Sequence, residues 1–291
     1  MTYLLLTVLL NVFIFSLFKL FPRYGIDNLP AIVVNYITCV VTGSLFIGKV
    51  PYSSVHLHQP WFYWALLMGG MFIGIFNFIA FTVRKTGLTA TTIANKLSLV
   101  IPVIFSVFLY HEKLSGLKII GIFAAFPAVY LATRTGEKEN KQSWTLPLLL
   151  FLCSGLLDTL VKFTENRYLN TPTLQSVYLI YVFTTAAISG LVMIAVMAFQ
   201  KNIRWKKRNI LAGILLGIPN YFSMYYFVRL LHSNFLQSSA AIPINNMGIV
   251  LLSTLIAILF FKEKPTKARV CGLILSVLSI LLIYFADTHD S

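Results

Sequence analysis

Ten apolar stretches, each about long enough to cross a membrane, constrain this chain more than any other feature. A helix needs about 20 apolar residues to cross the hydrocarbon core, where only helices and closed barrels can satisfy their own backbone polar groups. The sequence therefore predicts an all-α membrane protein with ten transmembrane helices, at residues 3–21, 30–48, 61–83, 88–109, 116–133, 145–163, 173–199, 209–231, 235–261 and 268–285.

Charged residues are too few and too scattered to form a water-soluble surface or a nucleic-acid-binding patch. Only 11% of the residues are charged, against about 25% in soluble domains. The net charge of +14 comes mainly from Lys and Arg in the short segments between apolar stretches, which is typical of residues that set membrane topology. We therefore expect the lipid bilayer as the surroundings and no nucleic-acid partner.

The chain carries the same landmarks twice, in the same order. The pattern Gly-x-x-x-Gly-x-x-Asn ends at Asn77 in the third stretch and at Asn220 in the eighth. The other paired landmarks are Asn95 with Asn246, Glu112-Lys113 with Glu263-Lys264, and Lys19 with Lys162. These matches predict two five-helix repeats, residues 1–133 and 145–291, joined by a polar linker at 134–144. Because five is odd, the second repeat is expected to be inverted in the membrane, as in many secondary transporters.

This arrangement resembles the EamA-type proteins of the drug/metabolite transporter superfamily. The shared features are two five-helix halves, a Lys near the end of the first helix of each half, and a Glu-Lys pair closing the fourth. The resemblance implies alternating access around a central cavity, lined mainly by the third, fourth, eighth and ninth helices. It also implies a multi-pass protein of the bacterial cytoplasmic membrane, and it leaves the substrate and the oligomeric state open.

Lys96 is the most informative polar residue, because it lies about eight residues into the fourth stretch. A charge this deep costs about 3 kcal/mol to insert, so it usually faces a cavity or a partner. Thr92 lies one helical turn earlier and Asn95 is adjacent, so a cation and hydrogen-bonding groups lie together. We predict that they bind a carboxylate or phosphate of a substrate. The alternative is a structural pairing of Lys96 with a carboxylate or with helix-end carbonyls.

Amides and tyrosines recur in the helices that are expected to line the cavity. An amide in hydrocarbon needs a partner, which can be a substrate or a neighbouring helix. Tyrosines in the middle of a span are compatible with aromatic walls around a substrate, although some tyrosines serve as anchors at the membrane surface. The further candidate substrate-binding residues are Asn77, Asn220, Tyr221, Tyr225, Asn245 and Asn246.

Asp158 is the only carboxylate well inside a predicted span. A buried acid can take up and release protons in the working range of pH, which makes Asp158 a candidate for proton coupling. The alternative is an ion pair with Lys162, which lies four residues later on the same helix.

The sequence contains no motif of an enzyme or of a metal site. A Gly-x-Ser-x-Gly elbow, a His-Glu-x-x-His pair and a phosphate-binding loop are all missing, so we predict no catalytic residue, no metal and no cofactor. The chain is predicted to be a secondary transporter of a small polar metabolite that is anionic or zwitterionic. Two alternatives remain, a flippase for a lipid-linked sugar or phosphate and a membrane scaffold that transports nothing.

The distribution of Lys and Arg predicts the orientation of the chain in the membrane. Sixteen of the 23 lie in or beside the first, third, fifth, seventh and ninth connections, and six lie in or beside the other four. Because positive residues favour the cytoplasm, this count places both termini outside. The resemblance to EamA-type proteins implies both termini in the cytoplasm, and we favour the charge count.

Overall fold

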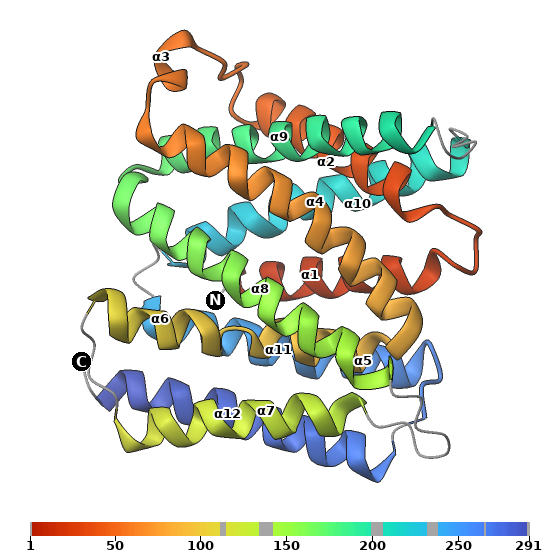
Figure 1. Cartoon of the computed structure of the whole chain (residues 1–291), viewed down its shortest axis with the longest axis vertical. Coiled ribbons are helices and arrows are strands. Elements are labelled where there is room, and N and C mark those ends of the chain that lie inside the picture. Colours follow the sequence, from red (N-terminus) through yellow and green to blue (C-terminus); the bar gives the residue numbers. More distant parts are fainter. Residues whose placement is uncertain are drawn as a thin grey trace.

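The computed structural model describes residues 2–110, 115–133, 142–198, 206–231, 238–264 and 266–289. Within these ranges all regular structure is helical, as the apolar stretches predicted. Figure 1 shows the helices stacked along the long axis of the molecule and lying across it, with α2 and α9 toward one end of the stack and α7 and α12 at the other. The helices are α1 (Thr2–Leu20), α2 (Asn28–Phe46), α3 (Ser54–Leu57), α4 (Pro60–Thr86), α5 (Leu88–Leu97), α6 (Val100–Tyr110), α7 (Gly116–Thr133), α8 (Gln142–Tyr168), α9 (Pro172–Ala198), α10 (Lys207–Leu231), α11 (Ser238–Leu259) and α12 (Lys267–His289).

Nine segments of the described chain are long and apolar enough to cross a membrane. The one remaining predicted span is the fifth, at residues 116–133; it corresponds to α7, whose apolar part, Gly116–Ala132, is shorter than these nine. Its length is close to the lower limit of about 17 residues for a spanning helix. Two predicted features, the Glu112-Lys113 pair and residues 134–141 of the linker, lie outside the described residues.

The fourth predicted span is not one continuous helix, because it breaks between α5 and α6 at Ser98 and Leu99. Pro102, four residues beyond Ser98, causes this break. It has no backbone N–H to donate to the carbonyl of Ser98, and its ring crowds the preceding turn. The Ser98 hydroxyl donates to the carbonyl of Asn95 at 2.5 Å. Broken helices are tolerated at membrane depth where they line a cavity. The break therefore marks Asn95 and Lys96, just before it, as part of a candidate site.

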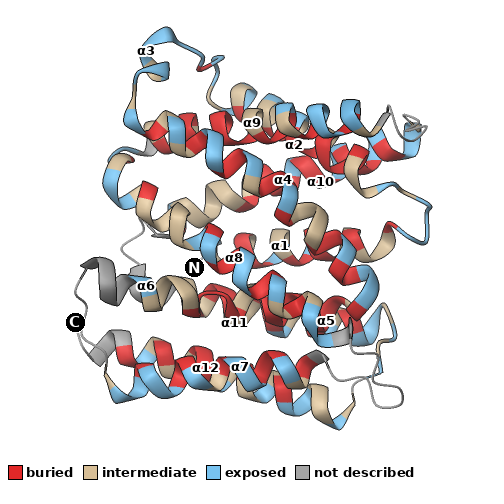
Figure 2. Cartoon of the chain, in the orientation of Figure 1, coloured by how far each residue is buried: buried red, intermediate tan, exposed pale blue. Residues whose placement is uncertain are grey.

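The two halves of the chain pack through reciprocal helix contacts. α2 packs on α10 and α4 packs on α9, while α1 packs on α10 and α4 packs on α8. If α1, α2 and α4 correspond to α8, α9 and α10, each of these contacts in one half has a counterpart in the other. α7 and α12, the last helices of the halves, pack on each other. Figure 2 shows buried residues concentrated on the faces along which the helices meet.

Glycines allow the closest of these approaches. A Cβ atom on Gly217 of α10 would lie 2.5 Å from Cβ of Thr38 and 2.6 Å from the carbonyl oxygen of Asn35, both on α2. On α4, the glycine in this role is Gly69, where a Cβ would lie 2.5 Å from Cβ of Thr185 on α9. Small residues at such crossings let two helix backbones pack directly.

The glycines of the repeated sequence pattern differ in their packing. A Cβ on Gly213 would lie 2.5 Å from Cβ of Val34 on α2, whereas Gly70, its partner in the sequence pattern, has open space within 4 Å of where a Cβ would stand. In α4 the neighbouring Gly69 makes the close contact instead. The pairing of Asn77 with Asn220 stays a prediction.

We expect Gly217→Ala to destabilise the protein by about 1–3 kcal/mol, since the added methyl group would overpack the α2–α10 contact. Gly74→Ala is the matched control, because nothing lies within 4 Å of a Cβ at that glycine. The free energy of unfolding in detergent micelles measures both. Equal stability of the two variants would contradict the close packing of α10 on α2.

Candidate functional site

A cavity of about 190 Å³ lies at the centre of the molecule, between α1, α4, α5, α6, α8, α10 and α11. The third, fourth, eighth and ninth predicted spans contribute to it, and the first and sixth, α1 and α8, do so as well. Of the predicted site residues, the structure brings six into its lining: Asn95, Lys96, Asp158, Asn220, Asn245 and Asn246.

Lys96 lies in the last turn of α5, directly before the helix break. Its ammonium nitrogen lies 5.9 Å from the centre of the Phe15 ring of α1, a cation–π arrangement. Within the described part of the chain, no carboxylate lies close enough to form an ion pair with it. Among the described residues, the side chain therefore offers a cation to the cavity without an ion-pair partner.

Asp158 of α8 faces the same cavity. Its carboxylate accepts from the hydroxyl of Ser98 at 3.1 Å, and this hydroxyl shares its one proton between Asp158 and the carbonyl of Asn95 at the helix break. The predicted ion pair with Lys162 is not found among the ion pairs of the described residues. A positive and a negative group thus line one cavity without neutralising each other through direct contact.

Amide groups complete the polar lining. The side chain of Asn246 donates to the backbone carbonyl of Lys96 at 3.1 Å, which ties α11 to the broken helix. Asn95 donates to the hydroxyl of Ser154 at 2.9 Å. Asn245 is only 3% exposed, and its side-chain oxygen has no hydrogen-bond partner within the described structure. A buried acceptor without a partner is costly, so Asn245 is well placed to accept a hydrogen bond from a solute.

Four predicted site residues lie outside the cavity lining. Asn77 donates to the carbonyl of Ile73 in its own helix at 2.8 Å, and the buried hydroxyl of Thr92 accepts from Ser253 at 2.9 Å. Tyr221 is buried against aromatic neighbours, and Tyr225 stacks near it and accepts from an arginine. We therefore leave these four out of the candidate site.

The aromatic wall of the cavity comes from phenylalanines that the sequence reasoning did not select. They are Phe15, Phe18, Phe72, Phe76 and Phe227. The chain has 24 phenylalanines, and nothing in the sequence distinguishes these five from the rest. For α1, the amide of Asn11 in an otherwise apolar run was an available indication that this helix lines the cavity.

Comparisons with known proteins agree with this architecture. The model of the EamA-like transporter family matches the chain twice, over residues 2–134 and 145–285. An uncharacterized protein of Haemophilus influenzae is 25% identical over 297 residues, with 98% of each chain covered. The crystal structure of a further protein is similar with a TM-score of 0.61 at 17% identity, covering 97% of this chain and 98% of that one. At this identity the structural likeness concerns the fold alone.

Proposed function

Because the chain belongs to the EamA-like transporter family, we propose that it is a secondary transporter of a small polar solute that is anionic or zwitterionic. The observation that carries this proposal is Lys96, a cation without an ion-pair partner among the described residues that lines a central cavity. A charge at membrane depth is retained where it serves a solute pathway or a partner. The family is one of transporters and not of enzymes, which agrees with the proposed transport function.

The polar groups of the cavity support the class of solute. Lys96 would bind a carboxylate or a phosphate, Asp158 would face a cationic group or a proton, and Asn245 would accept a hydrogen bond. The phenylalanines of the lining would contact an apolar portion of the solute. A scaffold that transports nothing has no need of an open polar centre, whereas a cavity lies between the helices of this chain.

The mechanism we propose is alternating access by two inverted five-helix repeats that together span the membrane ten times. Two matches of one family model, separated by a short gap, support the repeat. The reciprocal packing of α2 on α10 and of α4 on α9 supports an approximate two-fold relation between the halves. Two similar halves in opposite orientation can exchange conformations and so open one central site to each side in turn.

A thermal-shift screen of the purified protein tests the binding part of this proposal. A solute that binds only the folded state raises its apparent stability, by about 2.7 kcal/mol at 100 times the dissociation constant. We expect stabilisation by a soluble amino acid, organic acid, sugar phosphate or nucleotide sugar. Stabilisation by lipid-linked sugars alone would instead favour a flippase, and no stabilisation by any compound would favour a scaffold.

The orientation of the chain, in what we propose to be a bacterial cytoplasmic membrane, is testable separately. The count of Lys and Arg predicts both termini outside. A cysteine placed at Ser291, in a variant without Cys153 and Cys271, should therefore react with an impermeant maleimide added to intact cells. Reaction only after the membrane is opened would place the termini in the cytoplasm, as the family resemblance implies.

A further inference from the structure

The cavity is closed at one end by a seal of buried residues. On α4 the lining of the cavity ends at Ile79, seven residues before the end of the helix at Thr86. On α5 the lining begins at Asn95, seven residues after the start of the helix at Leu88. Seven helical residues rise about 10 Å. Buried side chains fill this interval: Thr82, Val83, Thr91, Thr92 and Ser253.

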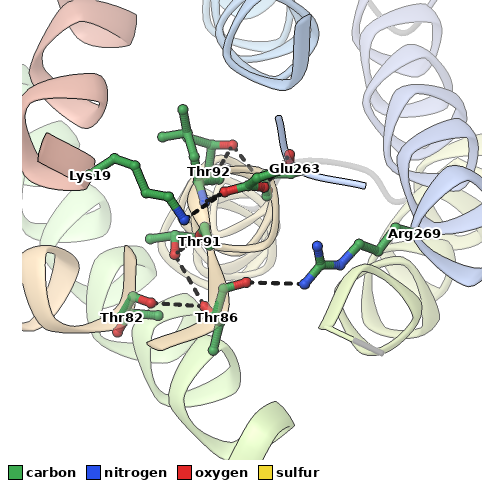
Figure 3. A network of polar contacts seen from close by, with 10 residues as sticks. Lys19, Thr82, Thr86, Thr91, Thr92, Glu263 and Arg269 are labelled. Atoms are coloured by element: carbon green, nitrogen blue, oxygen red, sulfur yellow. Dashed lines mark hydrogen bonds and ion pairs between the residues drawn. The ribbon is translucent and has the colours of Figure 1, made fainter. Parts of the chain in front are cut away.

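A network of polar contacts lies at the outer edge of this seal (Figure 3). Lys19, in the last turn of α1, contacts Glu263 with 2.9 Å between the ammonium nitrogen and Oε1. Glu263 also accepts from the backbone N–H of Leu88 at 2.8 Å and from the hydroxyl of Thr89 at 3.3 Å. Arg269 of α12 donates to the carbonyl of Thr86 at 3.3 Å. The network thus joins α1, α4 and α5 to the α11–α12 connection and α12.

The backbone conformations at Gly87 and at Lys262 bring Glu263 close to the start of α5. Gly87, directly before α5, has φ +93°, and a Cβ there would lie 2.9 Å from Oε1 of Glu263. Lys262 has φ +52°, in the left-handed region that non-glycine residues rarely adopt. This turn lets the N–H of Glu263 donate to the carbonyl of Ala257 at 3.0 Å and ends α11. Strained backbone held in place by its surroundings often marks a functional position.

The negative charge of Glu263 is stabilised by its neighbours in this network. Burial alone would raise the pKa of Glu263, but the N–H of Leu88 and the ammonium of Lys19 lower it below its ordinary value. The carboxylate also lies at the N-terminus of α5, where the helix dipole favours a negative charge. The network is therefore a stable contact between the two halves of the chain, since Lys19 and Leu88 belong to the first and Glu263 to the second.

The other end of the cavity has no such contact in the described structure. Lys162 occupies in the second half the position that Lys19 has in the first, and it lines the cavity without an ion pair to a described carboxylate. The residue of the first half that corresponds to Glu263 is Glu112, which lies outside the described residues. A second hollow shares Val161 with the cavity and continues to Gln175, in the first turn of α9. Among the described residues, the ion pair of Lys19 with Glu263 therefore has no counterpart at the other end of the cavity.

We propose that Lys19 and Glu263 form a latch that holds the cavity closed at the end where α1 and α11 terminate. Its opening would be the step that admits solute from that side. The proposal rests on the alternating access proposed above. Glu263 acts as a positioning residue, because it holds α1 and the start of α5 against the α11–α12 connection and does not line the central cavity.

Sidedness of cysteine labelling tests the latch without knowledge of the substrate. The reporter is Asn11→Cys, a partly exposed cavity position on α1 whose amide donates to the carbonyl of Thr7 in its own helix. Cys153 and Cys271, both exposed, are replaced by alanine, and the buried Cys39 is kept. An impermeant maleimide is added to right-side-out and to inverted membrane vesicles. With an intact latch, labelling from the latch side should be at least about tenfold slower than from the other side.

Glu263→Gln and Lys19→Gln are each expected to raise labelling from the latch side at least about tenfold. Lys19→Gln retains the bonds from Glu263 to α5, so it keeps the test valid if Glu263→Gln does not fold. The matched control is Lys206→Gln. It removes the exposed ion pair with Asp27, which also joins the two halves with 2.9 Å between nitrogen and oxygen, and it should leave the sidedness unchanged.

Two results would contradict the latch. If both latch variants are folded and label as the parent protein does, the latch is wrong and the proposed transport function is untouched. If the parent protein labels equally fast from both sides, the contact between Lys19 and Glu263 does not keep that end closed, and the latch is overturned. Alternating access would survive that result, because a site that opens to each side in turn can be reached from both.

Discussion

Replacing Lys96 with alanine is expected to lower transport of an anionic or zwitterionic solute by about 10- to 100-fold with little loss of stability. A hydrogen bond to a charged group contributes about 1.5–3 kcal/mol, and about 1.4 kcal/mol corresponds to a factor of ten. Breaking a buried ion pair would cost about 3–5 kcal/mol of stability. No ion pair joins Lys96 to a described carboxylate, so that loss is not expected. Initial uptake rates in proteoliposomes and the unfolding temperature of the same preparation measure the two effects.

Two further variants make the Lys96 result specific. Lys96→Arg should retain part of the activity, because the charge remains and its geometry changes. Lys267→Ala removes an exposed lysine at the start of α12 and should transport as the parent protein does. Normal binding and transport of anionic solutes by Lys96→Ala would refute the proposed role. A large loss of stability in Lys96→Ala that Asp158→Ala reverses would show a structural pair instead.

Replacing Asp158 with asparagine is expected to abolish accumulation driven by a proton gradient while leaving solute exchange intact. Asparagine can still accept the hydrogen bond from Ser98 that Asp158 accepts at 3.1 Å, but it cannot carry a proton. Because Asp158 and Lys96 line the same cavity, a proton on the carboxylate changes the charge that the solute meets. Accumulation under an imposed pH gradient, compared with exchange without one, separates coupling from binding.

Glu165→Gln is the matched control for Asp158→Asn, since Glu165 is another carboxylate in the described cavity lining. It should accumulate solute under the gradient as the parent protein does. Unchanged accumulation by Asp158→Asn would exclude it as the coupling group. An equal loss of accumulation and of exchange would assign Asp158 to solute binding alone.

The sequence was sufficient for the approximate positions of the apolar helices and for two of the charges that line the cavity. An apolar stretch of membrane length leaves few alternatives to a helix, and a charge within it must face a cavity or a partner. Lys96 and Asp158 follow directly from that physical cost, and both line the cavity. The break after Lys96 could also have been inferred, because Pro102 lies within the predicted fourth span.

The rotation of each helix about its own axis could not be predicted in the same way. A helix that is apolar on all sides shows no preferred face, and an amide can bond to its own backbone as readily as to a solute. Asn77 does so, whereas Asn220 donates to Asn35 across the α2–α10 contact and also lines the cavity. Tyr221 follows Asn220 directly and lies outside the lining.

The contact between Lys19 and Glu263 shows what only the three-dimensional arrangement can provide. Both residues were landmarks of the repeat in the sequence, but each was matched to a residue in the other half and not to one another. Their ion pair joins the end of the first helix to a connection more than 200 residues later. Spacing along the chain gave no indication of that pairing.

Solute counterflow in proteoliposomes tests the central claim most directly, because only a site open alternately to each side exchanges solute across the membrane in this way. The vesicles are loaded with an unlabelled carboxylate or phosphate metabolite that stabilises the purified protein, and a trace of the same labelled compound is added outside. The account predicts transient accumulation of label by the parent protein and a loss of about 10- to 100-fold in Lys96→Ala. Absence of counterflow with every stabilising compound, or equal counterflow in both proteins, would contradict it.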